Sequence, residues 1–559
     1  MLTKLRLKLS SFIERLAKAE ADPYFLALFR MGYALVAIVV VWRTYQQAGY
    51  LWEPGSLGYK TAVYFIFPAL VALLLCILVG FGGRAVVILH FLVLCTLNYS
   101  FPNVRYLDFR FNQAAAFWML FMRLNKVWSL DAYLSRERIR REPAPPAWPV
   151  YFLGITLSLW LLNAGWLKVV DPMWRDGLGF YYVFLLPWVK SANFNFLLDH
   201  LFVLKLLNYT AMAFEVSFIF LYCFRRTRFI AILLAIGFFI YLICPLRVDP
   251  VGQFGLVWCL GILSVTPLPK KLERALVRWR RRDDPNAGAA EIPAWHLRLR
   301  KYLIVGFAVY IVYLFAVFHV RAMPFYVFRK GLVTFVGYPF ALLDGTEKAL
   351  AKEPRAVRGM KWALDAAYRP LKAVDAPLFT LNQYTTSLQF NGLFGIDHSI
   401  AIFLYRVELE MDDGTREEPV KVFNEDMTAG PYSDGLFTPR YIQGAMYGVT
   451  GMCHRLATRP GYALSAAEVD VLKRLIGFSL FKLGGERAAY VRRAVIKVRP
   501  ILVPYDYVGN ARTWEARGWT DFYVYEPASG EYRIENLPER YPLQIPLKTF
   551  SGGLLVLEP

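Results

Sequence analysis

Long apolar runs separated by short polar segments fill the first 320 residues and predict a helical membrane domain. A helix needs about 20 mostly apolar residues to cross the hydrocarbon core of a bilayer. Nine runs are candidates for such spans, at 24–42, 62–81, 85–99, 111–124, 149–167, 206–224, 229–245, 251–266 and 302–320. We therefore expect an all-α polytopic bundle of about nine transmembrane helices.

A different pattern begins near residue 385 and predicts a soluble domain. Residues 401–411 alternate between apolar and polar and end in Asp412-Asp413-Gly414, a hairpin turn that leads into a strand at 419–423. Ser465 and Glu468 have the spacing of a capping box, which predicts a helix running to about Leu483. Further strand-like runs lie at 494–504 and 522–525, the second followed by a turn at 528–530. The C-terminal part is therefore expected to be a soluble, β-rich α+β domain.

These patterns divide the chain into four parts. We expect an amphipathic cytoplasmic segment over 1–23, a transmembrane domain over 24–320, an interfacial or linker helical segment over 321–384 and an extracytoplasmic α+β domain over 385–559. The apolar stretch 178–189 is too short to span, so we expect a re-entrant or interfacial segment on the outer side. We expect the similar stretch 324–343 to lie along the outer surface just after the last span.

Charge supports this topology. The chain has a net charge of +21, and its basic residues cluster between the apolar runs. With the N-terminus in the cytoplasm, 24 Lys and Arg residues fall in inner segments and 8 in outer segments, as the positive-inside rule requires. We therefore expect a multi-pass protein, most simply of a bacterial inner membrane, with its C-terminal domain in the periplasm. The same placement argues for contact with a lipid bilayer and against nucleic-acid binding.

Cysteine and histidine give no sign of a metal centre. Of six cysteines, Cys453 alone falls in the predicted soluble domain, so that domain cannot hold an internal disulfide. No Cys/His grouping has the spacing of zinc ligands. We expect no metal site.

A carboxylate in an apolar span needs a physical reason, because a charge near the bilayer centre costs about 2.5–3.5 kcal/mol on insertion scales. Glu215 lies near the middle of the span 206–224 and is expected to face the bundle interior. Arg30 in the first span and His90 in the third are candidate partners. Two interpretations stay open, a polar clamp between helices and a functional group.

Lys168 ends an uncharged run that begins at residue 149, within the phrase Ala164-Gly-Trp-Leu-Lys-Val-Val-Asp-Pro-Met-Trp-Arg-Asp-Gly177. At the outer membrane face it could be a snorkelling lysine whose ammonium reaches water. Alternatively, Trp166, Trp174 and the segment 178–189 could surround it with apolar groups. Desolvation then favours the neutral amine, which can act as a general base.

The Ala-Gly-x-x-Lys…Asp…Trp-x-x-Gly phrase resembles the motif of the catalytic lysine in vitamin K-dependent γ-carboxylases and the wider HTTM-domain family. Lys168, Trp174 and Gly177 match its lysine, tryptophan and glycine, with one additional residue between lysine and tryptophan. Two further phrases are similar to the family, Asp22-Pro-Tyr-Phe-Leu-Ala-Leu-Phe-Arg30 and Val127-Trp-Ser-Leu-Asp131. The likeness covers about residues 22–320.

The resemblance implies a carboxylase, a carbon–carbon lyase in its chemistry. The lysine of such enzymes deprotonates vitamin K hydroquinone, oxygenation by O2 generates a strong base, and CO2 adds to the resulting glutamate carbanion. Lys168 would be the catalytic residue, with Arg30, Glu215, Trp174 and Gly177 as substrate-binding or structural groups. The carboxylases also carry an Asn-His pair in a stretch that here reads Asp108-Phe-Arg-Phe-Asn-Gln113, with no histidine, and a later histidine where this chain has Ile243-Cys244-Pro245. A divergent or inactive homologue is therefore also expected.

A second family shares some of these residues. Lipase maturation factors also combine several spans, a Gly-x-x-Lys…Trp-Arg phrase and a lumenal domain, and Lys168 with Trp174-Arg175 resembles that phrase. This alternative implies a non-catalytic maturation or chaperone protein that binds an extracytoplasmic client. A transporter is a third and weaker hypothesis, because no inverted repeat is visible.

Overall fold

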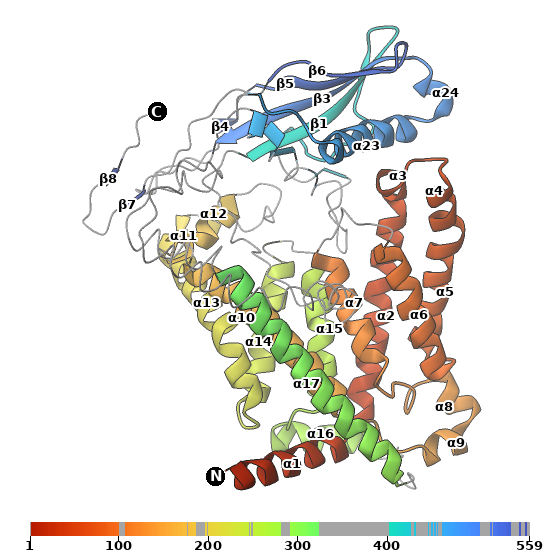
Figure 1. The fold of residues 1–559 in the computed structure, drawn as a ribbon, viewed down its shortest axis with the longest axis vertical. Coiled ribbons are helices and arrows are strands. Elements are labelled where there is room, and N and C mark those ends of the chain that lie inside the picture. Colours follow the sequence, from red (N-terminus) through yellow and green to blue (C-terminus); the bar gives the residue numbers. More distant parts are fainter. Residues whose placement is uncertain are drawn as a thin grey trace.

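A computed structural model of the chain places a bundle of helices beneath an antiparallel sheet (Figure 1). The structure describes residues 2–99, 107–170, 172–175, 177–185, 196–197, 199–244, 246, 250–280, 291–323, 402–425, 430–431, 445, 449–450, 452–453, 455–456, 461–502, 515–516, 518–537, 547–548 and 554–555. The predicted segment 324–343 and most of the predicted linker 321–384 lie outside these residues.

Helices of the N-terminal part overlap the predicted apolar runs, and further helices lie between these runs. They are α1 (Leu2–Lys18), α2 (Pro23–Gln46), α3 (Ala48–Leu51), α4 (Leu57–Thr61), the π-helix η1 (Ala62–Ile66), α5 (Phe67–Val79), α6 (Gly83–Tyr99), α7 (Leu107–Met119), α8 (Leu130–Leu134), α9 (Arg136–Arg141), α10 (Trp148–Val170), α11 (Pro172–Arg175), α12 (Gly179–Leu185), α13 (Leu201–Cys223), α14 (Arg228–Ile243), α15 (Val251–Leu263), α16 (Lys270–Arg280) and α17 (Ala294–Met323).

Four helical segments of the described chain are long and apolar enough to cross a membrane, namely Pro23–Gln46, Leu57–Val79, Trp148–Trp166 and Leu201–Cys223. Three shorter apolar helices lie at Gly83–Leu97, Arg228–Ile243 and Val251–Leu263. The protein is therefore a membrane protein with a helical N-terminal region. The predicted number of nine crossings and the predicted orientation stay predictions.

The predicted hairpin, helix and strands of the C-terminal part are present. The sheet has the order β2-β1-β3-β5-β6, and β4 also pairs with β3. Its strands are β1 (Ile402–Met411), β2 (Arg416–Glu417), β3 (Val491–Leu502), β4 (Glu515–Ala516), β5 (Thr520–Glu526) and β6 (Glu531–Ile534), and a separate pair is formed by β7 (Leu547–Lys548) and β8 (Leu554–Leu555). The second strand of the hairpin is shorter and earlier than the predicted 419–423, because it ends at Glu417.

Helix α23 (Ala466–Leu483) connects the sheet to the bundle, and α24 (Gly485–Ala488) follows it. Ser465 and Glu468 form the predicted capping box at its start. The Phe478 ring lies 6.3 Å from that of Tyr50 in α3, and Arg474 Nη1 donates to the Leu51 carbonyl over 2.8 Å. Helix α23 therefore lies between the sheet and α3 (Figure 1).

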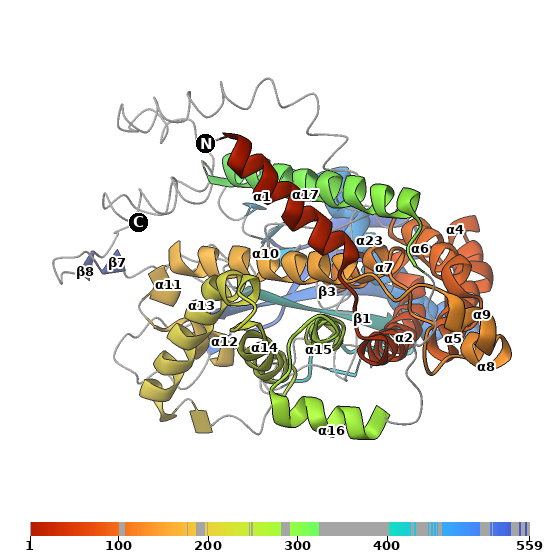
Figure 2. The same ribbon diagram turned by 90° about the horizontal axis from the view of Figure 1, so that it is seen from below.

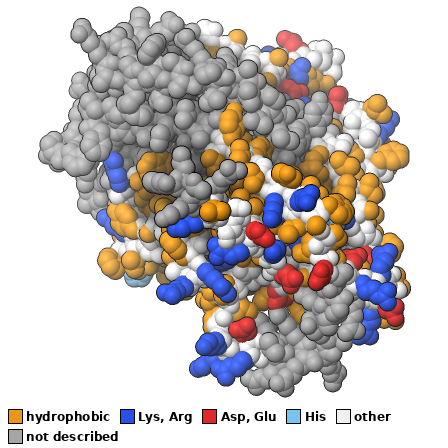
Figure 3. All heavy atoms as spheres, turned by 60° about the horizontal axis from the view of Figure 1, so that its bottom comes forward, with side chains coloured by type: hydrophobic (Ala, Val, Ile, Leu, Met, Phe, Trp, Pro, Cys, Tyr) orange, Lys and Arg blue, Asp and Glu red, His pale blue; other side chains and the backbone are white. Residues whose placement is uncertain are grey.

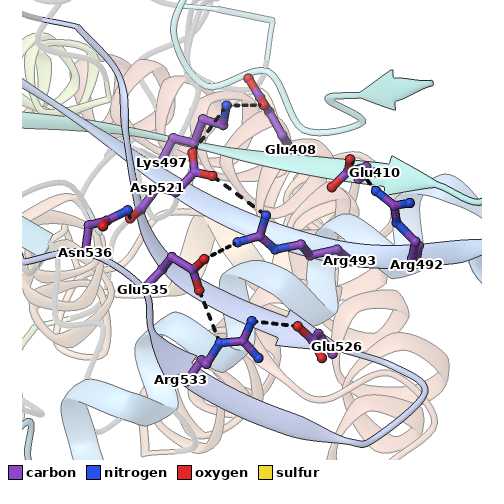
Figure 4. Close-up of polar contacts among 10 residues, drawn as sticks. All are labelled: Glu408, Glu410, Arg492, Arg493, Lys497, Asp521, Glu526, Arg533, Glu535 and Asn536. Atoms are coloured by element: carbon purple, nitrogen blue, oxygen red, sulfur yellow. Dashed lines mark hydrogen bonds and ion pairs between the residues drawn. The ribbon is translucent and has the colours of Figure 1, made fainter. Parts of the chain in front are cut away.

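The sheet face opposite α23 carries a network of ion pairs (Figure 4). Lys497 Nζ lies 2.8 Å from Glu408 and 3.4 Å from Asp521. Arg493 pairs with Glu535 at 2.9 Å. Residues of alternate positions on a strand share a face, so the apolar positions of β1 and β3 turn to α23 while these charges turn away from it. The sheet thus has one packed face and one polar face.

Candidate active site

Lys168 lies near the C-terminal end of α10, a long and almost uncharged helix. Helix α13 packs along α10, and Gly165 makes their approach close. A Cβ atom at Gly165 would lie 2.8 Å from Glu215 Cβ and 3.1 Å from the backbone nitrogen of Val216. Since Cβ contacts under 3.0 Å essentially do not occur, any larger residue at 165 would hold the two helices further apart. The glycine of the phrase therefore brings the Lys168 and Glu215 backbones together.

Lys168 and Glu215 form a buried ion pair. The Lys168 Nζ atom lies 2.5 Å from Glu215 Oε1, and the two side chains are 5% and 2% exposed. Glu215 thus faces the bundle interior as predicted, but neither of its two candidate partners was right. The lysine side chain meets a carboxylate inside the bundle, so snorkelling into interfacial water does not describe it.

The pair lies well below the predicted outer boundary. Glu215 is nine residues from the start of the predicted span 206–224, which is about 14 Å at 1.5 Å per residue. Side chains of an α-helix lean towards its N-terminus, so the long Lys168 side chain extends inward from the end of α10. This direction lets a residue at a helix end reach a carboxylate deep in the neighbouring helix.

Trp174 covers the pair. Its side chain is fully buried, and Lys168 Nζ lies 4.9 Å from the centroid of its ring, within the range of a cation–π interaction. Asn208 Nδ2 donates to the Trp174 carbonyl over 2.7 Å and so fixes α11 on α13. A Cβ at Gly179 would lie 2.2 Å from the indole, so this glycine makes room for the ring. Trp166 is two residues before Lys168 and projects from the other side of α10.

Gly177 shapes the turn between α11 and α12. Its φ of +79° lies in the left-handed region, which glycine adopts without strain. Tyr209 of α13 donates from its hydroxyl to the Arg175 carbonyl over 2.8 Å, next to this turn. After it, α12 is buried against α11 through Phe180, whose ring lies 5.2 Å from that of Trp174. The predicted surface segment 178–189 thus begins as a buried helix.

Two buried acceptor atoms of α13 have no hydrogen-bond partner among the described residues. They are Glu215 Oε2 and Asn208 Oδ1. The two residues are seven positions apart, so they lie on the same face of α13. An unsatisfied buried polar atom costs about 1–3 kcal/mol. The site can therefore accept hydrogen bonds from a ligand that carries hydroxyl groups.

Arg30 holds a different part of the structure. Its Nη1 donates to the Leu124 carbonyl over 3.0 Å and its Nη2 donates to the Trp128 carbonyl. The Tyr24 and Trp128 rings lie 5.3 Å apart. These contacts join the two other phrases of the family resemblance, 22–30 and 127–131. Arg30 is thus a structural residue of α2 and has no contact with Glu215.

His90 belongs to a polar cluster that sequence reasoning missed. Tyr33 donates from its hydroxyl to Asn112 Oδ1 over 2.6 Å and lies 2.8 Å from His90 Nε2. All three side chains are buried, and they come from α2, α7 and α6. Polar residues within apolar runs were the signal in the sequence that could have revealed this cluster. The same signal applies to Asn208, which lies on the face of α13 that carries Glu215.

Comparison with known protein families gives one match, over the part of the chain that holds these residues. Residues 19–248 match the family model described as HTTM domain. No curated protein and no solved structure matches the chain. The matched range includes Lys168, Trp174, Gly177 and Glu215.

Proposed function

The chain carries an HTTM domain, and on this premise we propose that it is a membrane-embedded enzyme in which Lys168 acts as a general base. The proposed reaction is that of a γ-carboxylase, the carboxylation of protein glutamate driven by a quinol. The proposed orientation places the N-terminus in the cytoplasm and the sheet outside, in a bacterial inner membrane. The observation that carries the proposal is the burial of the Lys168 amine against Glu215 under the indole of Trp174.

The pair can supply a neutral amine without losing a proton to solvent. In the proposed mechanism the Lys168 ammonium passes a proton to Glu215 Oε1, which lies 2.5 Å from Nζ. When this proton lies on Glu215, the amine has a free electron pair and can accept a proton from a hydroxyl group. The products of that transfer are an ammonium and an oxyanion, which attract each other strongly in a medium of low dielectric constant. The ring of Trp174 also favours the ammonium and keeps water from it.

The residues present fit a ring-bearing quinol. Lys168 would face its hydroxyl group, and the unpaired Glu215 Oε2 and Asn208 Oδ1 would accept hydrogen bonds from it. Trp174 would lie beside the ring. Reduced vitamin K, when bound, supplies the reducing power that the carboxylation consumes together with O2 and CO2. Asn208 keeps Trp174 in place through its carbonyl.

The test uses the full-length protein in detergent or nanodiscs. It is given reduced vitamin K, labelled bicarbonate and a glutamate-rich peptide, and both label incorporation and quinone epoxide are measured. We expect both products from the wild type and from Lys60→Ala, which changes an exposed lysine far from α10. Lys168→Ala should give neither. Failure of the wild type under conditions in which a known carboxylase works would refute the reaction.

A non-catalytic maturation or client-binding protein is the second candidate. The mutual neutralisation of Lys168 and Glu215 favours it, because a paired and enclosed lysine can serve as a clamp between α10 and α13. The polar face of the sheet would then engage an extracytoplasmic client. The double variant Lys168→Met/Glu215→Leu separates the two candidates. An apolar clamp preserves client function, whereas an enzyme loses all turnover.

A further inference from the structure

A group of cations gathers at the end of the bundle opposite the sheet, around the start of α17. Arg84 of α6 lies close enough to Arg123 and Arg300 for its charge to act on both, and Arg123 and Arg300 act on each other. All three charges also act on His296. Figure 3 brings this end of the molecule forward and shows Lys and Arg side chains among hydrophobic ones.

Two of these arginines are held by backbone carbonyl groups. Arg123 Nη1 donates to the Pro143 carbonyl over 2.9 Å, and Arg300 Nη1 donates to the Ala17 carbonyl over 3.1 Å. Lys126, beside them, donates to the carbonyl of Ile139 over 2.8 Å. Within the described residues, Arg84 has no hydrogen bond or ion pair. Three cations are therefore fixed in place, and the guanidinium of Arg84 is available.

The nearby carboxylates do not balance these cations. Glu142 lies 3.8 Å from Arg123 Nη1, and the charge of Glu20 acts on Arg300 and Lys126. The charge of Asp131 acts on Arg30, and its two oxygens accept hydrogen bonds from Gly82 N and Asn125 Nδ2. Arg84, Arg123, Lys126 and Arg300 thus face Glu20 and Glu142. The excess of positive charge would stabilise a bound anion.

The start of α17 also favours an anion at this end of the bundle. The N-terminal end of a helix carries a partial positive charge and is stabilised by nearby anions. The first turn of α17 has no acidic residue and contains His296, with Arg298 and Arg300 in the next turn. Burial, together with the charges of Arg123, Arg300 and Arg84, lowers the pKa of His296. The N-terminal end of α17 and its basic side chains therefore both favour a bound anion.

We propose that Arg84, Arg123 and Arg300 form a binding site for the phosphate of an anionic phospholipid. This inference goes beyond the proposed function and does not depend on it. Helices α17 and α1, which contribute residues to this end of the bundle, carry exposed apolar side chains that suit the acyl chains of a lipid: Trp295, Leu299 and Tyr302 on α17, and Leu9 and Phe12 on α1. Helix α1 runs beside α17 and across this end of the bundle (Figures 1 and 2), as an interfacial helix does. Basic pockets between membrane helices bind such headgroups.

The experiment measures lipid binding by the purified full-length protein. Delipidated protein in neutral detergent is titrated with dioleoylphosphatidylglycerol or dioleoylphosphatidylcholine, and bound lipid is counted by native mass spectrometry. Arg84→Gln is the test variant, because removing this side chain breaks no hydrogen bond of the described fold. Arg138→Gln is the matched control, since it removes one exposed arginine from α9 at the same end.

We expect phosphatidylglycerol to bind the wild type more tightly than phosphatidylcholine does. Arg84→Gln should weaken phosphatidylglycerol binding about fivefold, the usual effect of one basic residue near an anionic lipid, and Arg138→Gln should change it less than twofold. Equal losses in the two variants would overturn the site in favour of diffuse surface charge. Competition by millimolar inorganic phosphate as strong as that by phosphatidylglycerol would overturn the assignment to a lipid.

Discussion

The pair Lys168–Glu215 permits a quantitative test of its own burial. In Lys168→Met the carboxyl of Glu215 loses its partner, and in Glu215→Leu the ammonium of Lys168 loses its partner. In the double variant, two apolar side chains of similar volume face each other. If the pair is buried, each single substitution should lower the stability of the protein, and the double substitution should not.

The magnitude follows from the geometry. Both side chains are almost fully enclosed and their polar atoms are 2.5 Å apart, so a lone partner cannot turn to water. Removing one member of such a pair destabilises a protein by about 3–5 kcal/mol, and replacing both by apolar residues is often neutral. The coupling energy between the two sites should therefore be at least about 3 kcal/mol in favour of the double variant.

Thermal unfolding in a single detergent is the appropriate measurement. For a domain of about 200 residues, 1 kcal/mol shifts the unfolding midpoint by about 2–4 °C. Each single variant should unfold about 6–20 °C below the wild type, and the double variant within about 3 °C of it. Lys60→Ala, on the protein surface, should leave the midpoint unchanged.

Two results would refute this reasoning. Single variants as stable as the wild type would mean that water or lipid headgroups reach the pair. A double variant whose loss equals the sum of the single losses would mean that the residues act independently. Either result would also remove the basis for a proton transfer between Lys168 and Glu215.

Three further predictions concern other described positions. Gly165→Ala should lower stability by about 1–3 kcal/mol through the clash with α13, whereas Gly237→Ala, with open space around its Cβ, should not; thermal unfolding of both variants checks this. Ser465→Ala should remove the capping box and cost about 1 kcal/mol, seen as faster hydrogen exchange in the first turn of α23. Burial raises the pKa of Glu418 to about 7. The protonated carboxyl therefore contributes to the stability of the folded state below pH 4.5, and this contribution is lost as the pH rises through 7. Glu418→Gln should flatten the pH dependence of the free energy of unfolding over this range.

Local patterns predicted local structure well. The alternation before Asp412 and the turn at 412–414 gave the hairpin of β1 and β2, and the capping box gave the start of α23. Each of these features depends on residues within a few positions of one another. The second hairpin strand was placed too late because pairing stops at Glu417, and backbone pairing with β1 sets that limit.

The partner of Glu215 could not be predicted in the same way. It is 47 residues from Lys168 and meets it only because two helices pack closely at Gly165. On a linear reading, the lysine lay at the membrane boundary and the carboxylate near the bilayer centre. Their meeting requires that α13 extends beyond the end of α10 and that the lysine side chain leans back along its own helix. Neither feature can be recognised from the hydrophobic periodicity of a single apolar run.

The phrase around Lys168 therefore predicts a buried lysine more directly than a reaction. Gly165 permits the helix contact, Trp174 covers the amine and Gly177 forms the turn that places α12 beside it. All three are needed to bury Lys168, whether it transfers a proton or only clamps two helices. Turnover by the double variant Lys168→Met/Glu215→Leu distinguishes the two functions, because in this variant α10 and α13 keep their packing but the amine is absent.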